Sequence, residues 1–380
     1  MSRRAGRAPC MAALLALVAC GDPDGEPLPS EPEQPEGFRR VVVVDDLDHA
    51  WGMAFTPSGD ILVTERPGDL RIMRGGELLP DPVEGVPEVA TGGHGGLLDV
   101  ALHPDFAANA LVYLSYAKEE GGERTTAVAR GRLVDDRLED VEEIFVAEAW
   151  SGADQHFGSR LAFDEAGFLY VSIGERTDMD EAQDLTNHQG KIVRLRDDGT
   201  VPDDNPFVGE ADALPEIWAY GLRNVQGMAF HPGTGALWAS DHGPLEGDEI
   251  NVIRAGRNYG WPEITYGRDY DGSIISEDAA REGMEQPVHH WEEDAPATSG
   301  LAVYEGDAFP EWVGSVFVAG LAGERLTRLE VSGEQVVAEE VLLTSLHERI
   351  RDVTVGPDGF LYLLLDTDGP MLRLEPADGS

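Results

Sequence analysis

One histidine and one glutamate stand where the chain could carry out proton chemistry. His156 comes just before an apolar, strand-like run, and Glu175 comes just after the next such run. If the two runs form a hairpin, the turn returns the glutamate to the histidine. A neutral imidazole suits proton transfer because its pKa lies close to neutrality. An isolated histidine is more often a structural residue, so the pair alone leaves both interpretations open.

Arginine supplies nearly all of the positive charge. Only Lys118 and Lys191 among the 28 basic residues are lysines, so a basic group in a site is expected to be a permanently charged, planar guanidinium. Arg349 and Arg351 are two residues apart and would point to the same face of a strand. Such a pair fits carboxylates, although either arginine could instead be a surface counter-ion.

The adjacent carboxylates Asp248 and Glu249 offer the oxygen ligands that calcium prefers. From the sequence alone, an acidic pair of this kind is more often solvated surface than a metal site. No His/Cys cluster indicates zinc.

The overall composition excludes some classes of protein. The 380 residues carry 28 Lys+Arg against 72 Asp+Glu, a formal net charge of −44. Phosphate would be repelled, which excludes a nucleic-acid binder with a general basic surface. Hydrophobic residues make up 42% of the chain, which argues against disorder. The 45 Gly and 24 Pro recur between short apolar runs, a pattern typical of turn-rich β structure.

A hairpin-like unit repeats six times along the chain. Each copy joins two apolar strands through a turn of Pro, Gly, Asp or Asn. The copies begin near Gly52, Asp99, Arg160, Gly227, Gly300 and Asp352. Most are followed by a third short strand, as at Leu70–Met73, Lys191–Leu195 and Glu249–Ile253. Six such units predict an all-β fold, a six-bladed β-propeller of four-stranded antiparallel blades.

Two further strands flank the repeats. Residues 38–44 form a strand before the first unit, and Met371–Leu374 follow the last. We expect the two to complete a single blade and so hide its open edges. The predicted propeller spans residues 38–380. A two-sheet sandwich would also contain short strands, but it would not explain six copies of one hairpin.

Residues 1–20 are typical of an export signal. Arg3, Arg4 and Arg7 precede an apolar run from Met11 to Ala19, about half the length of a membrane-spanning helix. The run ends in Leu-Val-Ala-Cys-Gly, which resembles the lipobox of bacterial lipoproteins and predicts a lipid anchor on Cys20. The alternative is an ordinary signal peptide that happens to end in cysteine. Both interpretations place the protein outside the cytoplasm, in the periplasm or cell envelope, with membrane contact only through the anchor.

Residues 21–37 are rich in proline and acidic residues and show no apolar periodicity. They cannot bury a core, so we expect them to form a tether. Cys10 and Cys20 are the only cysteines. The domain that follows is therefore expected to contain neither a thiol nor a disulfide.

The segments between the predicted strands contain long motifs. They are Gly95–Phe106 (GGLLDVALHPDF), His156–Leu161 (HFGSRL), Ala182–Leu185 (AQDL), Pro202–Phe207 (PDDNPF), Glu216–Asn224 (EIWAYGLRN), His242–Pro244 (HGP), Gly247–Asn251 (GDEIN), Asn258–Pro262 (NYGWP) and Arg349–Asp352 (RIRD). On these motifs the chain resembles the soluble PQQ-dependent sugar dehydrogenases, and specifically the bacterial aldose sugar dehydrogenase branch of the glucose/sorbosone dehydrogenase type. The resemblance covers about Val42 to Pro376.

The resemblance implies an enzyme that oxidises the C1 hydroxyl of soluble aldose sugars to lactones. Hydride would pass to PQQ, and electrons would go on to an external acceptor, because the chain has no CxxCH haem motif. His156 would be the general base, and Glu175 would orient it. Arg223 would polarise the accepting carbonyl of PQQ, with Asn224 beside it.

The same resemblance implies further ligands. Arg349 and Arg351 would bind the carboxylates of PQQ, and Tyr270 would also contact the cofactor. Two calcium ions are implied. The backbone carbonyls of Gly243 and Pro244 would hold the ion bound to PQQ, which acts as a Lewis acid, whereas Glu249 and Tyr259 would hold a structural ion.

The chain departs from the family pattern at two places. His94 stands where the family often has Gln or Glu; we expect it to reach cofactor and substrate and to alter pH dependence or substrate preference. Ala322–Arg325 stand where some relatives carry a lysine that pairs with PQQ, so this contact is either missing or supplied by Arg325. Two alternatives to the dehydrogenase remain open at this point: a propeller that binds a sugar or protein without turnover, and a calcium-dependent propeller lactonase.

Overall fold

The computed structural model describes residues 37–367 and 369–377. They belong to the second of two units, Gly37–Ser380, into which the chain divides after Glu36. The predicted signal segment, 1–20, and the tether up to residue 36 lie outside the described residues. No helix in the described part of the chain is long and apolar enough to cross a membrane.

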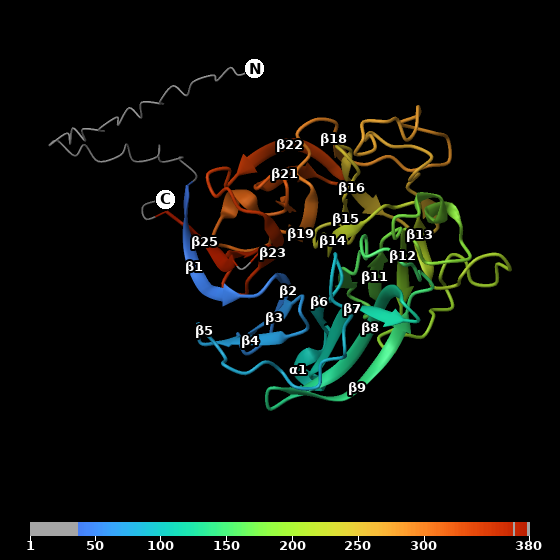
Figure 1. Cartoon of the computed structure of the whole chain (residues 1–380). Helices are drawn as coiled ribbons and strands as arrows, with labels where there is room; N and C mark the ends of the chain where they lie inside the picture. Colours follow the sequence, from blue (N-terminus) through green and yellow to red (C-terminus); the bar gives the residue numbers. More distant parts are fainter. Residues whose placement is uncertain (1–36, 368, 378–380) are drawn as a thin grey trace, which may run out of the picture. The chain divides into compact units, whose positions relative to one another are not determined.

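The described residues form six sheets, which are arranged around a ring as a six-bladed β-propeller (Figure 1). The first blade contains β2 (Ala50–Phe55), β3 (Ile61–Glu65), β4 (Leu70–Arg74) and β5 (Glu77–Leu78). The second contains β6 (Leu97–Leu102), β7 (Leu111–Glu120), β8 (Glu123–Val134) and β9 (Arg137–Val146). The third contains β10 (Leu161–Phe163), β11 (Leu169–Ile173), β12 (Lys191–Leu195) and β13 (Ile217–Tyr220).

The remaining blades follow in chain order. The fourth contains β14 (Val225–Phe230), β15 (Leu237–Asp241), β16 (Asp248–Ile253) and β18 (His289–Trp291). The fifth contains β19 (Thr298–Val303), β20 (Val316–Gly320), β21 (Leu326–Ser332) and β22 (Gln335–Leu342). The sixth contains β23 (Ile350–Val355), β24 (Leu361–Leu365), β25 (Gly369–Pro376) and β1 (Phe38–Leu47). Short helices lie between strands at α1 (Phe106–Asn109), η1 (Met179–Gln183) and η2 (Pro310–Trp312).

The sixth blade combines strands from the two ends of the described chain. Its outer strand, β1, pairs antiparallel with β25, with Val42 opposite Leu372. The predicted joining of these two strands is therefore confirmed, and β1 runs three residues beyond the predicted end at residue 44. The predicted six-bladed fold is also confirmed. The third blade adds one feature, the short strand β17 (Arg257–Asn258), which pairs in parallel with β13.

Apolar side chains fill the space between neighbouring blades. Leu62 and Leu70 of the first blade, for example, pack with Val112 and Leu114 of the second. The second strand of a blade lies between two other strands and is covered on both faces by neighbouring blades. It is therefore expected to be mostly apolar and buried along its length. The strands β3, β11, β15, β20 and β24 are accordingly buried at every position.

The first strand of each blade lines the centre of the ring. Each contacts the first strand of the next blade, from β2 through β6, β10, β14 and β19 to β23, which contacts β2 again. Because each hairpin is antiparallel, its first strand begins where its second strand ends, as in the pairing of Val225 with Asp241. Residues before the first strands and after the second strands therefore gather at one end of the ring.

A buried arginine joins four blades near the ring axis. Arg160, just before β10, has Nη1 3.0 Å from Oδ1 of Asp99 in β6. Its Nη2 lies 3.0 Å from Oδ1 of Asp352 in β23. Its Nε donates a hydrogen bond of 2.7 Å to the carbonyl of Gln226 in β14. This ion triad links blades that are far apart in the sequence.

Candidate active site

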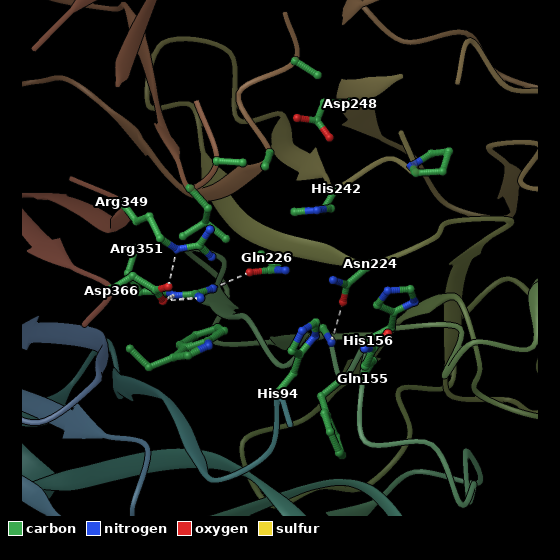
Figure 2. Close-up of a pocket in the computed structure, with 18 of the residues that line it drawn as sticks. His94, Gln155, His156, Asn224, Gln226, His242, Asp248, Arg349, Arg351 and Asp366 are labelled. Atoms are coloured by element: carbon green, nitrogen blue, oxygen red, sulfur yellow. Dashed lines mark hydrogen bonds and ion pairs between the residues drawn. The ribbon is translucent and has the colours of Figure 1, made fainter. Parts of the chain in front are cut away.

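A cavity of about 540 Å³ opens at the end of the ring where the first strands begin (Figure 2). That size is typical of small-molecule sites. Its walls come from loops of several blades, so distant parts of the sequence meet there. They include His94, His156, Asn224, Gln226, His242, Pro244, Tyr270, Arg349, Arg351 and Asp366.

The structure brings the histidine and glutamate of the third blade together. His156 precedes β10, Glu175 follows β11, and Nδ1 of the imidazole hydrogen-bonds to Oε1 of the carboxylate. A carboxylate can only accept, so Nδ1 carries the proton and Nε2 holds a lone pair that can accept. Nη2 of Arg223 lies 3.4 Å from Nε2 and donates toward it.

The surroundings of this pair favour its uncharged imidazole. Burial lowers the pKa of His156, and the charges of Arg223 and Arg176 lower it further. Burial raises the pKa of Glu175, while the same two arginines oppose that rise. The imidazole is therefore neutral at pH 7 and able to accept a proton on Nε2.

A glycine permits this close approach. His156 adopts a left-handed backbone with φ 53°. Gly174, between β11 and Glu175, packs directly against the backbone of His156. A Cβ at Gly174 would collide with the carbonyl group of His156 and would lie 3.0 Å from Oδ1 of Asn224. Only glycine fits at this position without displacing the histidine.

Arg223 and Asn224 are anchored by a carboxylate at the end of β15. Their backbone N–H groups donate to Asp241 at 2.9 and 2.7 Å respectively. Asn224 lines the main cavity, and its Oδ1 accepts from the N–H of Gly158 at 3.1 Å (Figure 2). The guanidinium of Arg223 lies behind this wall and lines a smaller adjoining cavity.

Arginines gather on another side of the main cavity (Figure 2). Arg349 precedes β23 and Arg351 lies in it, and Nε of each is 2.7 Å from the carboxylate of Asp366. Arg351 also donates to Oε1 of Gln226 at 2.6 Å. Arg66 lines the same cavity, and its Nε is buried without a hydrogen-bond partner. One carboxylate thus faces three guanidinium groups, and the excess positive charge could be balanced by an anionic ligand.

His94 and Tyr270, the two other predicted cofactor contacts, lie at different depths in the cavity. The ring of His94 is 6.1 Å from that of His156, centroid to centroid. Burial lowers the pKa of His94 to about 4, and the charges of Arg351 and Arg66 add to the effect. His94 is therefore neutral at pH 7, and any effect on pH dependence falls on the acid side. Tyr270 stands at the cavity rim and is 64% exposed.

Arg325 does not replace the missing lysine. It is buried, and its guanidinium pairs with the side chain and carbonyl of Asp294. Ala322 lines the cavity in its place. Of the two outcomes that the sequence allowed, the structure favours a missing contact.

The residues assigned to two calcium ions all line one small cavity of about 10 Å³. Gly243, Pro244, Glu249 and Tyr259 form its wall with Asp241 and Arg223. This volume accommodates one water molecule or one ion. The carbonyl of Gly243 accepts a hydrogen bond of 2.7 Å from Nη1 of Arg223, so a cation on this carbonyl would compete with the guanidinium.

One buried oxygen atom next to Glu249 has no hydrogen-bond partner. Oε2 of Glu249 accepts from Nδ2 of Asn251 at 3.1 Å, and Oδ1 of Asn251 is buried without a partner. Burial raises the pKa of Glu249 to about 8, with the charges of Asp241 and Asp248 adding to the effect. Nevertheless, no group of three or more His, Cys, Asp or Glu in the described residues is placed to hold a metal ion. Any cation here would need backbone or amide oxygens as well.

The sequence predicted Glu175 but not the other acidic residues that position the site. Like Glu175 after β11, Glu65, Asp241 and Asp366 end or directly follow the second strand of their blades. Glu175, Asp241 and Asp366 hold residues of the candidate site, as described above. Aligning the six repeats at this position would have revealed them. His242, also missed, lines the cavity and donates from Nδ1 to the carbonyl of Thr298 at 3.1 Å; only its place in a quoted motif pointed to it.

Comparison with known proteins identifies the family. The family model for glucose/sorbosone dehydrogenase matches residues 47–373. The aldose sugar dehydrogenase of Escherichia coli (strain K12) is 45% identical over 342 residues, which cover 88% of this chain and 92% of that protein. The chain belongs to the glucose/sorbosone dehydrogenase family.

Solved structures of glucose/sorbosone dehydrogenases share this fold. The apo form of the soluble aldose sugar dehydrogenase from Escherichia coli has a TM-score of 0.87 and 43% identity, covering 90% of this chain and 100% of its own. The PQQ-bound form of the aldose sugar dehydrogenase from Streptomyces coelicolor has a TM-score of 0.75 and 30% identity, covering 89% and 98%. The resemblance drawn from the motifs is thereby confirmed, and membership in this family makes the chain an oxidoreductase of the sugar dehydrogenase type.

Proposed function

We propose that the protein is a PQQ- and calcium-dependent dehydrogenase that oxidises the C1 hydroxyl of soluble aldose sugars to lactones. One observation carries this proposal. A neutral His156, fixed through Nδ1 by Glu175, lines a cavity that also presents the guanidinium groups of Arg349 and Arg351 (Figure 2). A proton acceptor and an anion-binding wall therefore face the same space.

The residues of the cavity fit PQQ, which carries three carboxylates and an ortho-quinone. Arg66, Arg349 and Arg351 outnumber the single carboxylate of Asp366 that they surround, in a chain whose net charge is −44. The buried, unpartnered Nε of Arg66 is a further free donor. These arginines would hold the carboxylates, with Asn224 and Tyr270 beside the rings. When bound, PQQ would supply an electrophilic carbon that accepts hydride.

The smaller cavity fits a calcium ion. Glu249 lines this cavity, and Oδ1 of Asn251, whose Nδ2 donates to Glu249, is buried without a partner. Calcium prefers oxygen ligands of this kind. Within this cavity Glu249 and Tyr259 would hold one ion. Pro244 also lines the main cavity, and the carbonyls of Gly243 and Pro244 would hold, on that side, the ion that acts as a Lewis acid. Dependence on calcium is part of the proposal.

The chain's own residues would move one proton. Nε2 of His156 accepts the proton of the C1 hydroxyl, and the carboxylate of Glu175 stabilises the imidazolium that forms. Arg223, which lies beside Nε2, would stabilise negative charge that develops nearby. The C1–H bond breaks with its electron pair as the C1–O bond becomes a carbonyl, so a cyclic aldose leaves as a lactone.

We further propose that an external acceptor takes up the electrons, because the chain has no CxxCH motif for a haem of its own. The export signal in residues 1–20 supports a site of action outside the cytoplasm, with a lipid anchor on Cys20.

The test is reconstitution of the purified protein with PQQ and Ca²⁺, followed by dye reduction on a panel of aldoses and polyols. We expect aldose-dependent reduction, equimolar lactone, and no turnover without PQQ. Saturable PQQ binding without turnover of any sugar would favour the binding propeller, and lactone cleavage without PQQ would favour the lactonase. Either result would overturn the proposal.

A further inference from the structure

Arg176 is a buried cation that the proposed chemistry does not use. It follows Glu175 and is fully buried, with an exposed fraction of 0%. No carboxylate in the described residues forms an ion pair with it, and its Nε has no hydrogen-bond partner. Glu175 and Asp154 attract its charge without pairing directly with it, and a buried cation that lacks a direct ion pair is costly. Its guanidinium is nevertheless held at a defined place.

That place is the back of the segment that carries His156. Nη2 of Arg176 donates to the carbonyl of Ala153 at 2.7 Å, and Nη1 donates to the carbonyl of Gln155. The guanidinium carbon also lies 3.6 Å from the ring centre of Phe157, a cation–π contact. The residues on both sides of His156 are therefore fixed by one side chain.

We propose that Arg176 is a positioning residue for His156: its guanidinium clamps residues 153–157 so that the histidine keeps its left-handed backbone and presents Nε2 to the cavity. The inference rests on the proposed role of His156 as the base. The histidine needs such support because φ of 53° is unfavourable for a residue with a Cβ.

The charge of Arg176 has a second effect on the same imidazole. The charged or titratable groups that face His156 are Glu175, Arg176, Arg223, His94 and His242. After burial, the charges of Arg223 and Arg176 are the causes that lower the pKa of His156. Removing the charge of Arg176 therefore raises this pKa, and the imidazole becomes protonated at a higher pH.

Two substitutions separate the clamp from the charge, and a third is the control. Arg176→Met removes both, whereas Arg176→Lys keeps the charge but cannot make the planar, two-pronged contact. Arg194→Met is matched, because Arg194 is also buried in the third blade, with its guanidinium carbon 3.9 Å from the ring centre of Phe168. Arg194 lies outside the cavity lining.

The first readout needs no cofactor. We would follow the imidazole nitrogens of the unloaded full-length protein by ¹⁵N NMR against pH, with His156→Ala to assign the signal. We expect the His156 signal to titrate at higher pH in Arg176→Met, and at the wild-type pH in Arg176→Lys and Arg194→Met. An unchanged titration in a folded Arg176→Met protein would overturn the electrostatic part.

The second readout is turnover of the protein loaded with PQQ and Ca²⁺. We expect kcat to fall about 10- to 100-fold in Arg176→Met and less in Arg176→Lys, with KM little changed, because misplacement of a catalytic group slows the chemical step. Wild-type kcat in Arg176→Lys would overturn the clamp, even if Arg176→Met does not fold. Absence of turnover in the wild type would instead refute the proposed function, and the NMR result would still stand.

Discussion

Each ring nitrogen of His156 has its own partner, and the two partners have different tasks. Glu175 accepts from Nδ1 and so fixes the tautomer, whereas Arg223 donates toward Nε2. The charge of Arg223 also disfavours protonation of the ring before substrate arrives. The result is a base that is oriented by one neighbour and kept neutral by the other.

Replacement of Glu175 by glutamine tests the first of these tasks. The amide can still accept from Nδ1 but cannot stabilise an imidazolium by charge, so we expect kcat to fall by about 10²-fold. Glu65→Gln is a matched control, because Glu65 is a buried carboxylate at the equivalent position of the first blade, where it accepts from the N–H of Asp48. Steady-state dye reduction measures both variants. Equal kcat in Glu175→Gln and wild type would contradict the assigned role.

A side-chain contact could be predicted from the sequence only where its two residues belong to the same local element. The His156–Glu175 contact could be predicted because a single hairpin brings the two residues together. The direction of Arg325 could not be predicted, because it depends on Asp294, a residue of the loop before β19. The hydrogen bond from Arg223 to the carbonyl of Gly243 is likewise set by a neighbouring loop.

At the scale of the element, the repeated hairpin explains why the site lies where it does. Each second strand ends beside the start of the first strand, so an acidic residue at its end meets the loop that precedes the blade. Glu175, Asp241 and Asp366 use this position to hold an imidazole, two backbone N–H groups and two guanidinium groups respectively. One structural position thus supports three parts of the site.

Gly174 tests how tightly the hairpin end must pack. We expect Gly174→Ala to lower kcat by at least about tenfold, because the added methyl would displace His156 and a shift of 1 Å can cost about 100-fold. Gly152→Ala is the control, since a Cβ there meets nothing within 4 Å and its φ is not positive. Thermal unfolding should be measured for both, alongside turnover. Normal kcat in Gly174→Ala would show that the close approach is not needed.

The elements themselves could be predicted from hydrophobic pattern and turn residues. The six hairpins and the β1–β25 pairing follow from strand periodicity that the sequence shows directly. The strand β17 could not be predicted, because two residues have no periodicity and its parallel pairing with β13 depends on the packing of a long loop.

At the scale of the whole molecule, the ion triad of Arg160 joins blades that are far apart in the sequence. We expect Arg160→Met to lower the free energy of unfolding by about 3–5 kcal/mol, because it leaves Asp99 and Asp352 buried without their cation. Urea denaturation measures this. Arg196→Met is the control, since its ion pair with Asp203 is exposed and is expected to contribute little. If Arg160→Met lowered the free energy of unfolding no more than Arg196→Met does, the stabilising role of the triad would be contradicted.

The buried carboxylates predict how stability depends on pH. Burial raises the pKa of Asp99, Asp241 and Asp248 to about 6 each, whereas the unfolded value is about 3.9. Between pH 4 and 6 these three carboxyl groups therefore bind more protons in the folded than in the unfolded state, so their contribution to stability falls as pH rises through this window. Repulsion within a chain of charge −44 acts in the same direction.

We accordingly expect the Tm of the unloaded protein to be higher near pH 5 than near pH 8, and added salt to recover part of the loss at pH 8. Differential scanning calorimetry across this range, at two salt concentrations, provides the measurement. A Tm that rises steadily from pH 5 to pH 8 would contradict the assigned protonation of these carboxylates.

The central claim joins a bound cofactor to one base, and titration with PQQ tests both together. Increasing PQQ should be added to the unloaded protein in the presence of Ca²⁺ and an aldose, and both binding and dye reduction should be followed. We predict that activity in the wild type saturates at one PQQ per chain, and that His156→Ala binds the same amount but turns over about 10²- to 10⁴-fold more slowly. Wild-type turnover in His156→Ala, or sugar oxidation that does not depend on PQQ, would contradict the account.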